Sequence, residues 1–123
     1  MPLLDYGFYV AILRFIARKT ERSDPTVAQM MDALLQAAAE IEASGRFTVA
    51  AEQLETTARA FAGVGAFLQR QILPEVVAEI NDSGERQVRW AVDAAMGAVN
   101  TLLARAVETP RLDVEITLDA PPD

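Results

Sequence analysis

The sequence predicts an all-α protein, an antiparallel four-helix bundle with its third helix kinked at Pro74, followed by a short C-terminal β-strand or extended arm. Two observations carry this prediction. Apolar residues recur with the helical period in four stretches of the 123-residue chain, and they alternate with a period of two near its C-terminus. We therefore expect one helical domain over residues 1–109 and a strand or acidic arm over residues 110–123.

The first helix is expected over Leu3–Thr20 and is apolar around most of its circumference. Phe15 lies on one face with several other large apolar side chains, while Tyr6 and Val10 lie on other faces. Such a helix is either central to a bundle or shared with a second chain. Because a small domain has little room for a fully enclosed helix, we expect Tyr6 and Val10 to lie at an oligomer interface.

The second helix has a clear start and a clear end. Ser23-Asp24-Pro25 precedes it, and a polar side chain there can cap the free N–H groups while proline suits the first helical turn. An apolar stripe then runs to about Ser44, and Gly45 is a typical C-terminal stop. We therefore expect this helix to end at Gly45.

The third helix is expected to start near Phe47 or Thr48. Gly63 and Gly65 lie inside it, which indicates close packing against another helix. Pro74 must kink or break the helix, because proline lacks an N–H group and clashes with the backbone one turn back. A short continuation over residues 75–81 follows.

The fourth helix is expected from the Asp82–Glu85 turn to about Glu108. The spacing of Asp82 and Glu85 fits a capping box. Trp90 lies opposite the centre of the apolar stripe, on a face with three small residues, Ala94, Gly97 and Thr101. A tryptophan above a groove of small residues is a plausible interface anchor. The alternative is a helix that packs on both sides within one chain.

The C-terminal tail alternates between apolar and polar residues. Its apolar positions are Leu112, Val114, Ile116 and Leu118. A single strand is not stable alone, because its backbone N–H and C=O groups are left without partners. No second strand is evident, so we expect pairing with another copy or with the sheet of a different protein. The alternative is a disordered acidic tail.

Paired carboxylates are the one pattern that points to catalysis. Glu52 and Glu55 form E-x-x-E, and Glu79 and Asp82 form E-x-x-D further along. This order resembles the magnesium site of the all-α nucleotide pyrophosphohydrolases of the MazG type. The resemblance implies carboxylates on two antiparallel helices that hold Mg²⁺ against a triphosphate. We prefer to interpret these residues as solvated acidic faces and a helix cap.

Composition narrows the possible chemistry. The chain has neither cysteine nor histidine, which excludes thiol nucleophiles, disulfides and His-based catalysis. Its net charge of −7 argues against nucleic-acid binding. The apolar stretch of the first helix is too short to span a bilayer and lacks the features of a secretory signal. We expect a cytoplasmic protein without catalytic residues, metal or cofactor.

By elimination, the leading prediction is a non-enzymatic protein-interaction module, a small oligomeric assembly, adaptor or inhibitor protein. Its expected contact residues lie on the first helix, the Trp90 face and the tail, and they are Tyr6, Val10, Trp90, Leu112, Val114, Ile116 and Leu118. A magnesium-dependent pyrophosphohydrolase-like enzyme is one alternative. An acidic inhibitor of a nucleic-acid-binding protein is another, supported by the negative charge and the small size.

Overall fold

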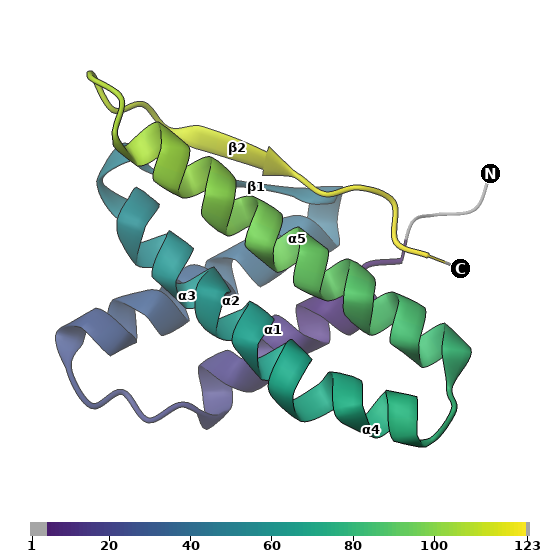
Figure 1. Cartoon of the computed structure of the whole chain (residues 1–123). Coiled ribbons are helices and arrows are strands. Elements are labelled where there is room, and N and C mark those ends of the chain that lie inside the picture. Colours follow the sequence, from purple (N-terminus) through teal and green to yellow (C-terminus); the bar gives the residue numbers. More distant parts are fainter. Residues whose placement is uncertain (1–4, 123) are drawn as a thin grey trace.

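A computed structural model describes residues 5–122. Within these residues, four helical stretches pack beside a two-stranded antiparallel sheet, as Figure 1 shows. The fold class expected from the sequence is therefore confirmed. The elements in chain order are α1 (Gly7–Lys19), α2 (Pro25–Ser44), β1 (Arg46–Val49), a 3₁₀ turn (Ala51–Gln53), α3 (Leu54–Phe67), a π-helical turn (Leu68–Ile72), α4 (Leu73–Ala78), α5 (Asp82–Ala106) and β2 (Val114–Thr117).

The predicted ends of α2 are confirmed. The Asp24 carboxylate caps the helix by accepting a hydrogen bond from the backbone N–H of Val27 at 3.0 Å. Gly45 ends it in the left-handed conformation, with φ of 73°, where a residue without a Cβ atom is favoured. For α1, the predicted start at Leu3 lies outside the described residues.

The cap of α5 differs from the prediction. Asn81, not Asp82, is the N-cap, and its side-chain oxygen accepts a hydrogen bond from the backbone N–H of Gly84 at 2.9 Å. Asp82 is the first helical residue instead. A carboxylate there still interacts favourably with the positive end of the helix dipole.

The third helical stretch starts later than predicted. Residues 46–49 form strand β1, so the expectation of a helix from Phe47 or Thr48 is wrong. The predicted disturbance of the helix at Pro74 takes the form of a π-helical turn at Leu68–Ile72, and the chain continues directly from it into α4. This wider turn contains Arg70, whose carbonyl Pro74 would otherwise approach too closely in a regular α-helix.

Strand β2 pairs with β1 of the same chain. The register joins Arg46 to Thr117 and Val49 to Val114. The prediction that the tail must pair with another molecule is therefore wrong. β1 was missed because it is only four residues long and follows directly on a helix stop, so its alternation of polar and apolar residues is too brief to stand out.

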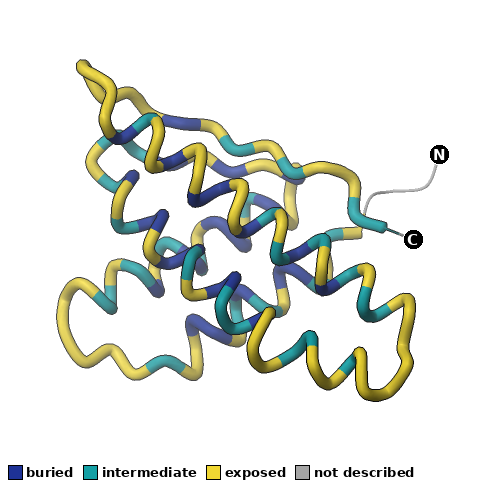
Figure 2. Tube along the Cα trace, in the orientation of Figure 1, coloured by how far each residue is buried: buried dark blue, intermediate teal, exposed yellow. Residues whose placement is uncertain are grey.

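The core lies between α1, α2, α3, α5 and the inner face of the sheet, with buried segments at the centre of Figure 2. Phe47 of β1 stacks on Phe61 of α3 with ring centroids 5.2 Å apart. Val10 is 2% exposed and Val114 is likewise 2% exposed. Both residues therefore belong to the core of a single chain, and the prediction that they contact a partner is wrong.

Burial of Tyr9 makes stability depend on pH. The phenol is 1% exposed, and burial raises its pKa well above the ordinary value of 10.0. The contribution of Tyr9 to the free energy of unfolding is therefore fully present below about pH 10. It falls as the pH rises further, because the phenol ionises in the unfolded chain while it stays protonated in the folded one. The loss should reach about 1.4 kcal/mol per pH unit.

Urea denaturation between about pH 9 and about pH 11 measures this effect, with Tyr9→Phe as the reference. The free energy of unfolding of the wild type should fall relative to that of Tyr9→Phe as the pH rises. Parallel stability curves for the two proteins would show that Tyr9 ionises equally in both states.

Candidate functional site

A groove of about 360 Å³ runs between α5 and β2. We call it the α5–β2 groove, and Figure 1 shows the two elements that form it, the yellow strand β2 beside the green helix α5. One wall comes from α5 and the other from β2 and the residues just after it. The lining residues are Trp90, Asp93, Ala94, Gly97, Ala98, Thr101, Glu115, Ile116, Thr117, Leu118 and Asp119.

Trp90 is held at one end of the α5–β2 groove by two tyrosines of the N-terminal region. Its ring centroid is 5.6 Å from that of Tyr9 in an edge-on arrangement and 6.2 Å from that of Tyr6. Such pairs fix the indole orientation. Trp90 stays partly exposed, so one side packs within the chain while the other lines the groove. The packing of Trp90 within one chain is therefore found, and its role as an interface anchor stays a prediction.

Gly97 lines the α5 wall of the groove beside open space. A Cβ atom added at Gly97 would meet no atom within 4 Å, so the chain itself does not fill this space. A glycine inside a helix is unfavourable relative to alanine. Packing within the chain therefore gives no reason for glycine at this position.

Two substitutions test whether the space is open. Gly97→Ala should raise the free energy of unfolding by about 0.5–1 kcal/mol, because alanine favours the helix and meets no neighbour. Gly63 in α3 is a matched control, since a Cβ atom there also meets nothing within 4 Å. Urea denaturation should show equal gains at both positions. A loss at Gly97 alone would mean that the chain occupies the groove.

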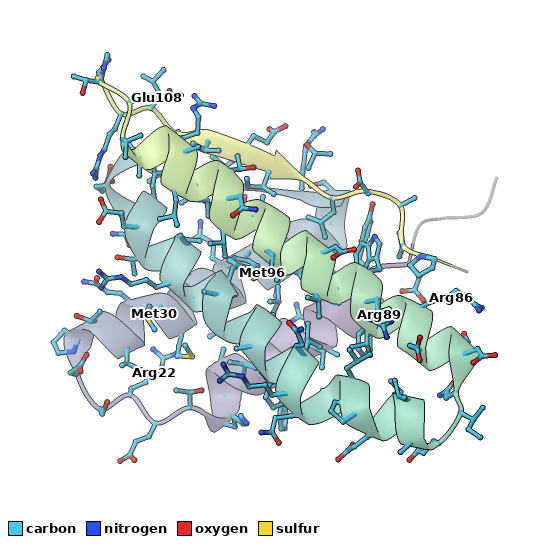
Figure 3. The ribbon with its side chains drawn as sticks, in the orientation of Figure 1. Arg22, Met30, Arg86, Arg89, Met96 and Glu108 are labelled. Carbon is cyan, nitrogen blue, oxygen red and sulfur yellow. The ribbon has the colours of Figure 1, made fainter. Side chains whose placement is uncertain are left out.

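Gly65 shows the contrasting case of a glycine at a helix crossing. A Cβ atom there would lie 2.9 Å from the sulfur of Met96, which projects from α5 in Figure 3. The predicted close packing is therefore found at Gly65 and not at Gly63. Only the former has a structural reason to lack a side chain.

The hydrogen-bonding pattern of the sheet determines which backbone groups face outward on each strand. Leu118 donates its backbone N–H to the carbonyl of Gly45 at 3.0 Å, so these two residues form a bonded pair. Opposite residues alternate between bonded and non-bonded pairs in an antiparallel ladder. The pairs Arg46–Thr117 and Thr48–Glu115 are therefore non-bonded, and their backbone groups point away from the partner strand.

Side chains of α2 cover the outer edge of β1. The Glu40 carboxylate accepts the backbone N–H of Thr48 at 3.2 Å, and the Ser44 hydroxyl donates to the carbonyl of Arg46 at 3.3 Å. For the outer edge of β2 there is no such cover among residues 5–122, where no hydrogen bond beyond the ladder involves Glu115 or Thr117. β2 is thus an open edge strand.

The lining of the α5–β2 groove is acidic. It contains Asp93, Glu115 and Asp119 and no basic residue. None of these three carboxylates takes part in the ion pairs found among the described residues. Arg86 and Arg89 precede the groove residues and lie toward the N-terminal end of α5 in Figure 3, and Arg89 is paired with Glu85 at 3.1 Å. Arg105, which follows the groove residues, is paired with Glu108 at 3.0 Å.

Three of the expected contact residues meet in this groove. Trp90, Ile116 and Leu118 line it together. Tyr6 and Leu112 do not line the groove. Tyr6 packs against the ring of Trp90, and Leu112, just before β2, is 58% exposed. Sequence reasoning did not identify the acidic groups, although Asp93 lies one turn after Trp90 and Glu115 alternates with the apolar tail residues.

The apolar side chains on the surface of α1 are partly covered by contacts within the chain. Phe15 is 51% exposed and lies against Phe67, with ring centroids 5.8 Å apart. The Lys19 ammonium lies 4.3 Å from the ring centroid of Phe67 and 5.3 Å from that of Phe15. These cation–π contacts partly cover both rings within the chain.

The carboxylates that resemble a magnesium site do not converge. Glu52 and Glu55 lie at the start of the third helical stretch, whereas Glu79 and Asp82 lie beyond its far end. Arg111 binds Glu55 at 2.6 Å. Within the described part of the chain, no group of three or more acidic side chains is placed to hold a metal ion.

Comparisons with known proteins give no relative: no family model, curated protein or solved structure matches the chain. Between residues 5 and 122, none of the helices has the length and apolar character needed to cross a membrane.

Proposed function

We propose that this chain is a non-enzymatic protein-interaction module that binds an extended segment of a partner protein in the α5–β2 groove. The observation that carries the proposal is the meeting of Trp90, Ile116 and Leu118 in one groove beside the open edge of β2. An aromatic anchor next to unpaired strand groups is a combination that peptide-binding surfaces use.

The size and make-up of the groove support a peptide segment as its occupant. A volume of about 360 Å³ accommodates a few side chains, and the α5 wall includes the small residues Ala94, Gly97 and Ala98. Such a surface suits the alternate side chains of an extended chain, because these project from the backbone at regular intervals.

The single tryptophan makes the proposal directly testable. Random linear peptides without tryptophan are selected on the protein, and each binder is titrated while Trp90 fluorescence is recorded. We expect binders whose titrations change this fluorescence, because Trp90 lines the α5–β2 groove.

Matched variants then assign the site. Gly97→Leu fills the groove and should weaken binding by about tenfold or more, which corresponds to about 1.4 kcal/mol. Gly63→Leu, at an equally open helical position outside the groove, should bind like the wild type. Failure to select any binder, or equal binding by both variants, would contradict the proposal.

A further inference from the structure

We infer that the partner segment is a basic, extended strand that adds to the outer edge of β2 as a third strand of the sheet. This inference rests on the proposed function and specifies its ligand. Three features of the structure lead to it: the direction of the unpaired backbone groups, the two faces of the sheet, and the charge of the groove.

The backbone of β2 offers a defined set of hydrogen-bonding groups. Glu115 and Thr117 point their N–H and C=O groups away from β1, as the phase of the ladder requires. An added strand meets two donors and two acceptors spaced two residues apart. Only an extended backbone matches this spacing, so a helix cannot satisfy the edge.

The faces of the sheet determine which side chains fit. Val114 and Ile116 point to the inner face, and Glu115 and Thr117 point to the outer face, since side chains alternate along a strand. An added strand continues both faces. Its inward side chains enter the space above Gly97 and should be apolar, while its outward side chains lie beside Glu115.

Charge selects the outward residues of the added strand. Glu115 and Asp119 share the outward phase of the alternation along β2, and no base lines the groove, so lysine or arginine at alternate positions pairs favourably across the edge. Acidic residues in the same places would face like charges. The expected ligand therefore alternates apolar and basic residues.

The same charges disfavour a second copy of this chain on the β2 edge. Two β2 strands from two copies could pair antiparallel through the outward groups of Glu115 and Thr117, and three registers bring these residues opposite one another. These place Glu115 opposite Glu115, Asp113 opposite Asp119, or Glu115 opposite Asp119. The first would also bring Arg111 opposite Asp119, but Arg111 is already bound to Glu55 at 2.6 Å. Because like charges directly opposite each other are destabilising, each register is penalised. A different, basic protein fits better.

Synthetic peptides test the inference on the full chain. The probe is a peptide of alternating valine and lysine. Its controls are the same pattern with glutamate for lysine, and a peptide of equal composition with the lysines grouped at one end. We expect the probe to change Trp90 fluorescence and to slow amide exchange at Glu115 and Thr117. Each control should bind about tenfold more weakly or worse.

N-methylation of the probe tests strand addition itself. Alternate amides of an added strand face β2 and the others face solvent, so methylating one set should abolish binding and methylating the other should not. On the protein, Glu115→Gln should weaken binding severalfold, whereas Glu52→Gln, at an exposed acid outside the groove, should not.

The outcomes separate the inference from the proposed function. Equal effects of the two methylated sets, binding of the glutamate peptide as tight as that of the probe, or unchanged exchange at Glu115 and Thr117 would each overturn the basic-strand inference. Selected peptides could still fill the groove, and the proposed function would then stand. If neither the probe nor any selected peptide binds, both fail together.

Discussion

Removing the chain after Thr109 will lower the free energy of unfolding by about 3 to 5 kcal/mol. Val114 is almost fully buried, and β2 covers Phe47 and Val49 of β1, which are themselves buried. The truncation exposes these side chains and leaves the backbone of β1 without its ladder. Urea denaturation followed by circular dichroism measures the loss.

Two single substitutions separate burial from loss of the whole tail. Val114→Ala removes buried methyl groups and should cost about 1–3 kcal/mol. Thr117→Ala, on the exposed face of the same strand, should change stability by less than about 0.5 kcal/mol. A truncated chain as stable as the full one would instead mean that the tail is a free arm.

Gly45→Ala will lower the free energy of unfolding by about 1–3 kcal/mol. Gly45 has φ of 73°, where a Cβ atom is unfavourable, and that atom would lie 3.0 Å from the ring of Tyr6. The same residue joins α2 to β1 and accepts the backbone N–H of Leu118. Strain here therefore reaches both the sheet and the support of Trp90.

A double-mutant cycle divides this cost into its two causes. In a Tyr6→Ala background the clash with the ring is gone, so Gly45→Ala should cost only the backbone part, about 1–2 kcal/mol. Chemical denaturation of the four proteins provides the cycle. Equal costs in both backgrounds would show that Tyr6 moves aside freely, and no cost in either would contradict the left-handed conformation of Gly45.

The helix ends that could be predicted are those that are encoded locally. Asp24 and Gly45 mark α2 through single hydrogen bonds and one backbone angle. Pro74 marks the break in the third helical stretch, although the sequence did not indicate that a π-helical turn would absorb it. Such signals depend on a few neighbouring residues, so the chain displays them without its tertiary context.

The sheet could not be predicted in the same way. β1 has four residues, and its partner lies near the other end of the chain, so nothing local identifies the pair. For the same reason, only one wall of the candidate site could be predicted from the sequence. Trp90 and Gly97 share one helix face, which the helical period reveals, but the opposite wall of the groove exists only once β2 has paired with β1.

Amide hydrogen exchange along β2 in the free protein tests most directly whether this strand is paired on one edge and open on the other. The amides of Val114, Ile116 and Leu118 should exchange slowly, whereas those of Glu115 and Thr117 should exchange fast. Slow exchange at all five residues would mean that the edge is already covered. Fast exchange at all five would mean that β2 does not pair with β1, and either result would contradict the open edge on which the proposed binding depends.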